Sequence, residues 1–109
     1  MKKTILVDLD GVLNEYTGNY DENNIPPIRE GAFDFLKNLS QNFIIKIFTT
    51  RPKQPALEWI KSNNLEQFIS DITNTKEPAY VIVDDRCINF GGNYSDTIEK
   101  IKNFKVWYK

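Results

Sequence analysis

Short apolar runs alternate with longer amphipathic or polar segments along this chain, and the alternation predicts strands and helices in turn. The apolar runs have strand length and are rich in Ile, Val and Phe, and apolar positions recur at helical spacing between them. We expect strands at residues 3–9, 43–48, 68–72, 80–83 and 104–107. We expect helices at residues 29–40, 52–64 and 93–102, the second of which begins at a proline.

This strand–helix order is typical of an α/β fold. It predicts a mostly parallel sheet with helices on both faces, which is a three-layer α/β/α, Rossmann-like arrangement. The chain has 109 residues, 40% of them apolar, which suits one domain with one core, so we expect residues 1–109 to form a single domain. Residues 11–28 are rich in Gly, Asn and Pro and are expected to form a loop.

Composition narrows the classes of function. The net charge of −1 provides no basic field for a nucleic-acid backbone, so we expect no nucleic-acid partner. No segment approaches the roughly 20 apolar residues of a membrane span, and the charged start Lys2-Lys3 is followed by too short an apolar stretch for a signal peptide. We therefore expect a cytoplasmic protein without membrane contact. The single cysteine, Cys87, forms no internal disulfide and is expected to be a small buried residue.

Histidine is absent, which removes the commonest general base and the commonest transition-metal ligand. Any catalysis must then rest on carboxylates, lysine, hydroxyls and a hard metal ion. Three expected strands end in such groups, and the carboxyl ends of parallel strands meet at one edge of a sheet. The residues at these ends are Asp8 and Asp10, Thr49 and Thr50, and Asp84 and Asp85. Crowded carboxylates repel one another unless a cation lies among them, and oxygen donors alone favour Mg²⁺.

The order of these strand ends resembles the haloacid dehalogenase superfamily, which consists mostly of phosphatases that use an aspartyl-phosphate intermediate. Its first motif, Asp-x-Asp-Gly after an apolar strand, is matched by Asp8-Leu9-Asp10-Gly11. Its second, a strand ending in Thr or Ser, is matched by Ile47-Phe48-Thr49. Its fourth is matched by Val83-Asp84-Asp85. The resemblance covers nearly the whole chain and is strongest to short phosphatase-like proteins without a cap domain.

The resemblance implies a role for each residue. Asp8 would be the nucleophile, and Asp10 would protonate the leaving oxygen and later activate water. Thr49 would donate a hydrogen bond to a phosphoryl oxygen, with Thr50 beside it in the substrate site. The Mg²⁺ ligands would be Asp8, the main-chain carbonyl of Asp10, and Asp85, while Asp84 would support them or bind the ion through water.

The third motif of the superfamily is a Lys or Arg that neutralises the phosphate, and here the pattern departs from the family. Lys76 is the best candidate, but it lies only eight residues before Asp84, and the intervening segment is too short for a helix of normal length. The long side chain of Lys76 could still reach the site from a loop. Arg51 and Arg86 are the substitutes, although a loop salt bridge is an equal expectation for Arg51.

Neither gap between the motifs can hold a cap domain, so we expect an open site with residues 11–28, including Asn14, Glu15, Tyr16 and Tyr20, as a flap. A Mg²⁺-dependent phosphomonoester hydrolase is the first interpretation, with a phosphorylated small molecule or a phosphoprotein as partner. Sugar phosphates, nucleotides and phosphoproteins remain open as substrates, as does the oligomeric state. Two alternatives to the hydrolase remain open. One is a receiver-type module that accepts a phosphoryl group, and the other is a phosphatase-like fold retained for binding or regulation without turnover.

Overall fold

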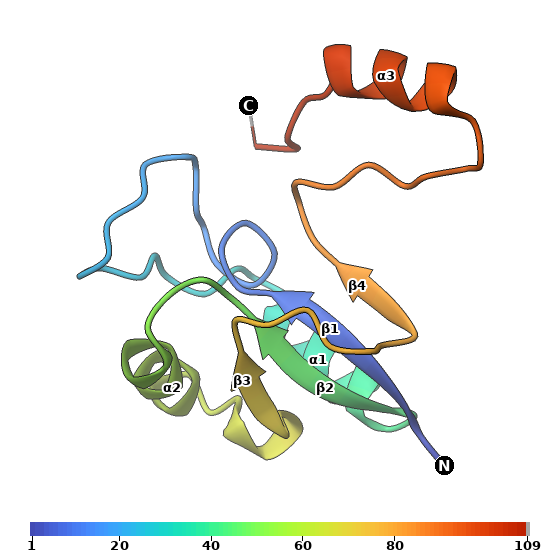
Figure 1. Cartoon of the computed structure of the whole chain (residues 1–109). Coiled ribbons are helices and arrows are strands. Elements are labelled where there is room, and N and C mark those ends of the chain that lie inside the picture. Colours follow the sequence, from blue (N-terminus) through green and yellow to red (C-terminus); the bar gives the residue numbers. More distant parts are fainter. Residues whose placement is uncertain (109) are drawn as a thin grey trace.

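The structure, a computed structural model that describes residues 1–108, has an all-parallel sheet of four strands (Figure 1). The strand order is β3-β2-β1-β4, so the first strand is central and the chain moves outward in both directions from it. The strands are β1 (Lys3–Asp8), β2 (Phe43–Phe48), β3 (Asp71–Thr73) and β4 (Val81–Val83). The α/β class and the parallel sheet predicted from the sequence are confirmed.

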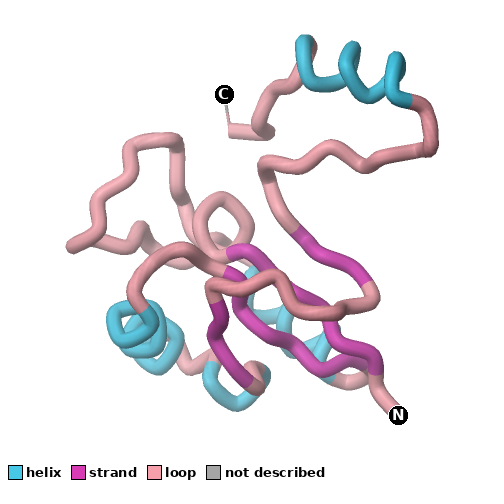
Figure 2. The backbone as a smooth tube through the Cα atoms, in the orientation of Figure 1, coloured by secondary structure: helices cyan, strands magenta, loops and turns pink. Residues whose placement is uncertain are grey.

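Two α-helices and one short 3₁₀ helix lie between the strands of the described chain, and a third α-helix follows β4, as the tube in Figure 2 shows. The α-helices are α1 (Ala32–Ser40), α2 (Lys53–Ser62) and α3 (Tyr94–Lys102), and the 3₁₀ helix is η1 (Glu66–Phe68). Each α-helix falls within a predicted span. The first helix begins three residues later than expected and the second ends two residues earlier, where turns occupy residues 30–31 and 63–64, and the other ends agree within one residue.

Alternate residues of β1 and β2 build the main core. Their side chains on one face pack against Leu36 of α1 and Ile60 of α2, so both helices cover the same face of the sheet. The strand residues in this core are Ile5, Val7, Ile45, Ile47 and Ile72. All five are buried, and none is more than 6% exposed. The four strands with these two helices hold the strand ends that bear the predicted site residues.

The segment 74–80, which leads from β3 to β4, crosses the opposite face of the sheet (Figure 1). Glu77 on this crossover bonds to Lys46 of β2 at 2.7 Å, and the Tyr80 amide donates to the Thr4 carbonyl of β1 at 2.8 Å. Leu6, at the centre of that face, is fully buried. The sequence predicts helices on both faces, and the arrangement is compatible with a three-layer α/β/α fold, but the third helix does not lie against the sheet.

Helix α3 stands away from the sheet at the end of an extended connection (Figures 1 and 2). None of its residues is buried. The Asn93 side chain caps its first turn by accepting a hydrogen bond from the Asp96 amide at 3.0 Å. No helix among residues 1–108 is long and apolar enough to cross a membrane.

The prediction of a last strand at residues 104–107 is wrong, because this segment is an irregular tail. The Trp107 indole donates to the Gly11 carbonyl at 2.7 Å, and the Arg29 guanidinium lies 4.1 Å from the centre of the Trp107 ring. These contacts hold the tail over the loop that follows β1 rather than beside β4 (Figure 1). The C-terminal segment is thereby brought close to the candidate site.

Candidate active site

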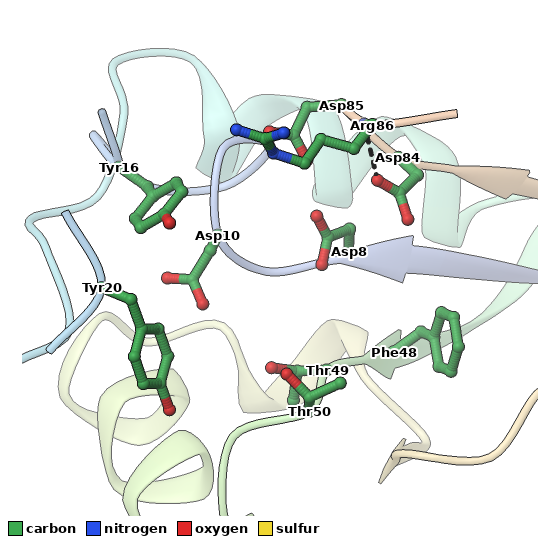
Figure 3. Close-up of a pocket in the computed structure, with 10 residues that line it drawn as sticks. All are labelled: Asp8, Asp10, Tyr16, Tyr20, Phe48, Thr49, Thr50, Asp84, Asp85 and Arg86. Atoms are coloured by element: carbon green, nitrogen blue, oxygen red, sulfur yellow. Dashed lines mark hydrogen bonds between the residues drawn. The ribbon is translucent and has the colours of Figure 1, made fainter. Parts of the chain in front are cut away.

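The carboxyl ends of β1, β2 and β4 meet at a pocket of about 280 Å³ (Figure 3). Its walls combine carboxylates and hydroxyls from the strand ends with aromatic rings, two of which come from the loop that follows β1. The lining residues are Asp8, Asp10, Tyr16, Tyr20, Phe48, Thr49, Thr50, Asp84, Asp85 and Arg86. The aspartates and threonines predicted at the strand ends therefore all line one pocket, whereas Lys76 does not, as expected for polar groups at the carboxyl edge of a parallel sheet.

Asp8, Asp84 and Asp85 form an acidic cluster in which the nearest carboxylate oxygens lie within 4.8 Å of one another. Asp8 ends β1, and the pairing of β1 with β4 brings the other two acids beside it. The Arg86 amide donates to Asp84 Oδ1 at 2.8 Å, which fixes the turn after β4. The cluster places three oxygen donors on one side of the pocket.

Burial is the main cause that raises the pKa of Asp8 to about 9, and a hydrogen bond with Asp85 and the charges of Asp84 and Asp85 act in the same direction. The donor set contains carboxylate oxygen only, which is the chemistry that a hard divalent ion such as Mg²⁺ prefers. Asp8, Asp84 and Asp85 are the residues that could hold one.

Gly11 makes room for this cluster. Its φ is +83°, in the region that side chains disfavour, and a Cβ built on it would lie 2.6 Å from Cγ of Asp85. Gly11 therefore allows both the sharp turn after β1 and the close approach of the Asp85 carboxylate. The glycine of the Asp-x-Asp-Gly motif has a direct steric role here.

The Asp10 side chain points away from the acidic cluster and toward Arg51. Nε of Arg51 donates to Asp10 Oδ2 at 2.8 Å, and Nη2 donates to Oδ1 at 3.1 Å. Asn14 is fully buried, and its side-chain Nδ2 donates to Asp10 Oδ1 at 3.0 Å. Its side-chain Oδ1 accepts hydrogen bonds from the main-chain amides of Gly11 and Tyr16. The prediction that the Asp10 main-chain carbonyl is a metal ligand stays a prediction.

Arg51 connects several parts of the site although it is only 3% exposed. Its main-chain amide donates to Thr49 Oγ1 at 3.1 Å. Its side chain contacts the flap, because Nη1 donates to the Asp21 carbonyl at 2.8 Å and Cζ lies 4.6 Å from the centre of the Tyr20 ring. The sequence left two interpretations of Arg51 open, a cation that balances charge at the site and a salt bridge within a loop. Its position directly after the two threonines at a strand end was the available signal for a role in the site.

Thr49 is 5% exposed, and its amide donates to the Thr73 carbonyl at 3.0 Å. Because Thr49 Oγ1 accepts the Arg51 amide, the hydroxyl proton remains able to point to an acceptor in the pocket. This geometry suits the predicted contact between Thr49 and a phosphoryl oxygen. Thr50 is exposed at the same rim.

The predicted flap is closed at its base by an antiparallel bridge between Asn14 and Ile28. The Arg29 amide donates to the Leu13 carbonyl and the Glu15 amide to the Pro27 carbonyl, each at 2.9 Å. Residues 15–27 therefore form a loop with a fixed base, and this loop carries Tyr16 and Tyr20 to the pocket.

Two expectations differ from the structure. Lys76 is exposed on the crossover segment and does not line the pocket, because the neighbouring Glu77 is bonded to Lys46 on the face of the sheet. The guanidinium groups near the pocket belong to Arg51 and Arg86. Cys87, expected to be buried, is exposed on the extended connection after β4.

Comparison with known proteins shows a structural likeness but no family. No family model matches the chain, and no curated protein matches it. Among solved structures, a conserved protein from Bacteroides thetaiotaomicron is similar, with a TM-score of 0.64 and 23% sequence identity. The similarity covers 98% of this chain and 95% of the other. At this identity the likeness supports the fold alone.

Proposed function

We propose that this protein is a Mg²⁺-dependent phosphomonoester hydrolase that acts through a phosphorylated Asp8. One observation carries the proposal: a candidate nucleophile, a second carboxylate, a hydroxyl and a cluster of oxygen donors line the same pocket. No second domain covers the pocket within residues 1–108, so the substrate would be a phosphorylated small molecule or an exposed phosphorylated side chain. A cytoplasmic location belongs to the same proposal.

In the first step, a carboxylate oxygen of Asp8 attacks phosphorus, and the bond from phosphorus to the leaving alcohol oxygen breaks. Asp10 gives a proton to that oxygen, so an alcohol leaves and an aspartyl phosphate remains. Asp10 lies two residues beyond Asp8, in the loop that starts where β1 ends. This spacing would allow Asp8 to act on phosphorus while Asp10 acts on the leaving oxygen of the same bond.

In the second step, Asp10 takes a proton from water while the water oxygen attacks phosphorus. The bond from phosphorus to Asp8 breaks, and inorganic phosphate leaves. The Arg51 guanidinium donates to both carboxylate oxygens of Asp10 and would hold this group in position for the step. The Thr49 hydroxyl donates to a phosphoryl oxygen in both steps.

The acidic cluster is the part of the site that a metal ion would complete. Bound there, Mg²⁺ would offset the charge of the carboxylates and of the phosphoryl oxygens. Asp8, Asp84 and Asp85 are the side chains that would hold it.

A binding or regulatory role without turnover is the second candidate, and two observations favour it. Asp10 is already engaged by Arg51 and Asn14, and the predicted third-motif lysine is not at the pocket. A receiver-type module would instead become phosphorylated on Asp8 and release phosphate slowly. The hydrolase and the receiver-type module predict different lifetimes for a phosphoryl group on Asp8, whereas the binding role predicts that none forms.

The test is a screen of phosphorylated metabolites and phosphopeptides with Mg²⁺, with release of inorganic phosphate as the readout. We expect turnover that is lost in EDTA, restored by Mg²⁺, and abolished in Asp8→Asn, because an amide is a poor nucleophile. Asp34→Asn is the matched control, since Asp34 lies in the first turn of α1 outside the pocket.

Rapid quenching followed by intact-mass measurement separates the candidates. The hydrolase predicts a transient, hydroxylamine-sensitive phosphoryl adduct on Asp8. A stable adduct without phosphate release would indicate a receiver-type module. Turnover retained in Asp8→Asn would contradict the mechanism.

A further inference from the structure

The pocket has an acidic side and an aromatic side. The acidic cluster of Asp8, Asp84 and Asp85 lies at the strand ends, whereas two aromatic rings, Tyr16 and Tyr20, stand on the flap side (Figure 3). In this view the Asp10 carboxylate lies between the two rings. The carboxylate assigned to the leaving group therefore lines the same pocket as the two rings.

Both flap rings are held by contacts with other parts of the chain. Tyr20 lies over the Arg51 guanidinium at 4.6 Å, and Arg51 is itself fixed by Asp10 and by the Asp21 carbonyl. Tyr16 meets the edge of Tyr108 with a centroid distance of 5.9 Å and an interplanar angle of 81°. Rings that are already oriented lose little conformational entropy when a ligand stacks on them.

The C-terminal tail provides the support behind Tyr16. Tyr108 also packs edge-on against Trp107 at 5.1 Å, and Trp107 donates to the Gly11 carbonyl at 2.7 Å. The segment at residues 104–108, where the sequence predicts a strand over 104–107, therefore packs behind Tyr16 through Tyr108 and Trp107.

We propose that Tyr16 and Tyr20 bind a planar aromatic ring in the leaving group, so that the substrate is a small phosphomonoester with such a ring, of the size of a nucleoside monophosphate. This inference rests on the proposed hydrolase function, because Asp10 defines the leaving-group side. Aromatic side chains stack on flat π-systems with little dependence on the identity of the ring. The pocket volume of about 280 Å³ lies just below the usual range for ligand pockets and therefore favours a small ligand.

The exposure of Tyr20 supports a binding role. The ring covers a buried guanidinium, yet 52% of the residue remains exposed at the pocket rim. If Tyr20 only shielded Arg51, its loss would affect all substrates equally. If it stacks on substrate, its loss should affect only substrates that carry a ring.

The experiment compares adenosine 5′-monophosphate and uridine 5′-monophosphate with ribose 5-phosphate. All three release a primary alcohol from the same sugar carbon, so they differ in the presence of a base and not in the bond that breaks. We expect kcat/KM for the nucleotides to exceed that for ribose 5-phosphate by about tenfold or more, in line with one stacked ring.

Variants assign the preference to the flap rings. Tyr20→Leu and Tyr16→Leu should each bring the kcat/KM ratio of nucleotide to ribose 5-phosphate toward one. Tyr80→Leu is the matched control, because Tyr80 is 59% exposed and lies outside the pocket, and it should keep the ratio of the parent. A parent ratio near one, or equal losses on all three substrates in Tyr20→Leu, would overturn the inference.

Calorimetric binding to Asp8→Asn with Mg²⁺ separates this inference from the proposed function. Tighter binding of the nucleotides than of ribose 5-phosphate, lost in the additional Tyr20→Leu change, supports the aromatic site even if no substrate is turned over. Equal binding of all three ligands rejects the aromatic site, and turnover of ribose 5-phosphate would still leave the hydrolase function standing.

Discussion

Arg51 and Asp10 form a two-pronged ion pair that joins the end of β2 to the loop after β1. Nε and Nη2 of Arg51 donate to the two carboxylate oxygens at 2.8 and 3.1 Å, and the side chains are 1% and 18% exposed. The pair fixes the orientation of the proposed acid–base group. It also links the site to the flap through the Asp21 carbonyl.

Removal of the Arg51 side chain should destabilise the protein. Arg51→Ala leaves the Asp10 carboxylate without its cation and should lower the free energy of unfolding by about 3 kcal/mol, the cost of breaking a buried ion pair from one side. The double variant Asp10→Leu with Arg51→Met should recover much of this loss, since it removes both charges. Urea denaturation at neutral pH measures each value.

The Lys53–Asp71 pair provides a control for that measurement. Its atoms are 3.2 Å apart, but the two side chains are 66% and 45% exposed. Lys53→Ala should therefore change stability little, because solvent screens an exposed pair. A loss in Arg51→Ala no larger than in Lys53→Ala would show that burial does not strengthen the Arg51–Asp10 pair.

Gly11→Ala should disturb the acidic cluster as well as the backbone. Ala at a φ of +83° costs about 1–2 kcal/mol in the left-handed region, and the added Cβ would displace the Asp85 carboxylate. We therefore expect lower stability together with weaker Mg²⁺ binding. Urea denaturation and calorimetric titration with Mg²⁺ measure the two effects.

Gly31→Ala separates backbone strain from crowding. Gly31 has a φ of +90°, but a Cβ built there meets nothing within 4 Å. This variant should lose similar stability while Mg²⁺ binding is unchanged. Equal loss of Mg²⁺ affinity in both variants would contradict the steric role of Gly11 beside Asp85.

The polar strand ends could be predicted from the sequence because their placement follows from local patterns. Apolar runs define β1, β2 and β4, and parallel pairing brings Asp8, Thr49 and Asp84 to one edge whatever the rest of the chain does. The register of neighbouring strands then completes the pocket. No knowledge of long-range side-chain contacts is needed for this part of the site.

The remaining features depend on contacts between distant segments, which no local pattern encodes. Arg51 reaches Asp10 across 41 positions of sequence, and Trp107 reaches Gly11 across 96. The apolar pattern of residues 104–107 is compatible with a strand, but the indole and the Arg29 guanidinium stabilise a different placement. The path of the crossover segment 74–80 over the sheet likewise depends on a long-range contact, the Lys46–Glu77 pair.

Lys76→Ala tests whether that crossover contributes charge to catalysis. Lys76 is exposed and lies outside the pocket, so we expect turnover within about twofold of the parent, because a solvated charge at a surface interacts weakly with distant groups. Steady-state kinetics with any hydrolysed substrate measures this. A loss of about a hundredfold would instead place the Lys76 ammonium at the phosphate during the reaction.

The pH dependence of stability without metal should report on Asp8. Its pKa is raised from the ordinary 3.8 to about 9, so between these values the folded state holds a proton that the unfolded state has lost. Stability must then decrease as pH rises across this window. The lowered pKa values of Asp71 and Glu77 act below about pH 5, where stability increases with pH. Measurements from pH 5.5 to 8.5 therefore isolate Asp8.

In EDTA, the urea midpoint of the parent should fall between pH 5.5 and 8.5, whereas Asp8→Asn, which cannot ionise at this position, should show a flatter profile. Saturating Mg²⁺ should stabilise the parent more at pH 8.5 than at pH 5.5, because a metal ligand must be deprotonated and protons compete at the lower pH. Parallel profiles for the parent and Asp8→Asn in EDTA would mean that Asp8 ionises freely in the folded protein, and the crowding that makes this cluster a candidate metal site would then be absent.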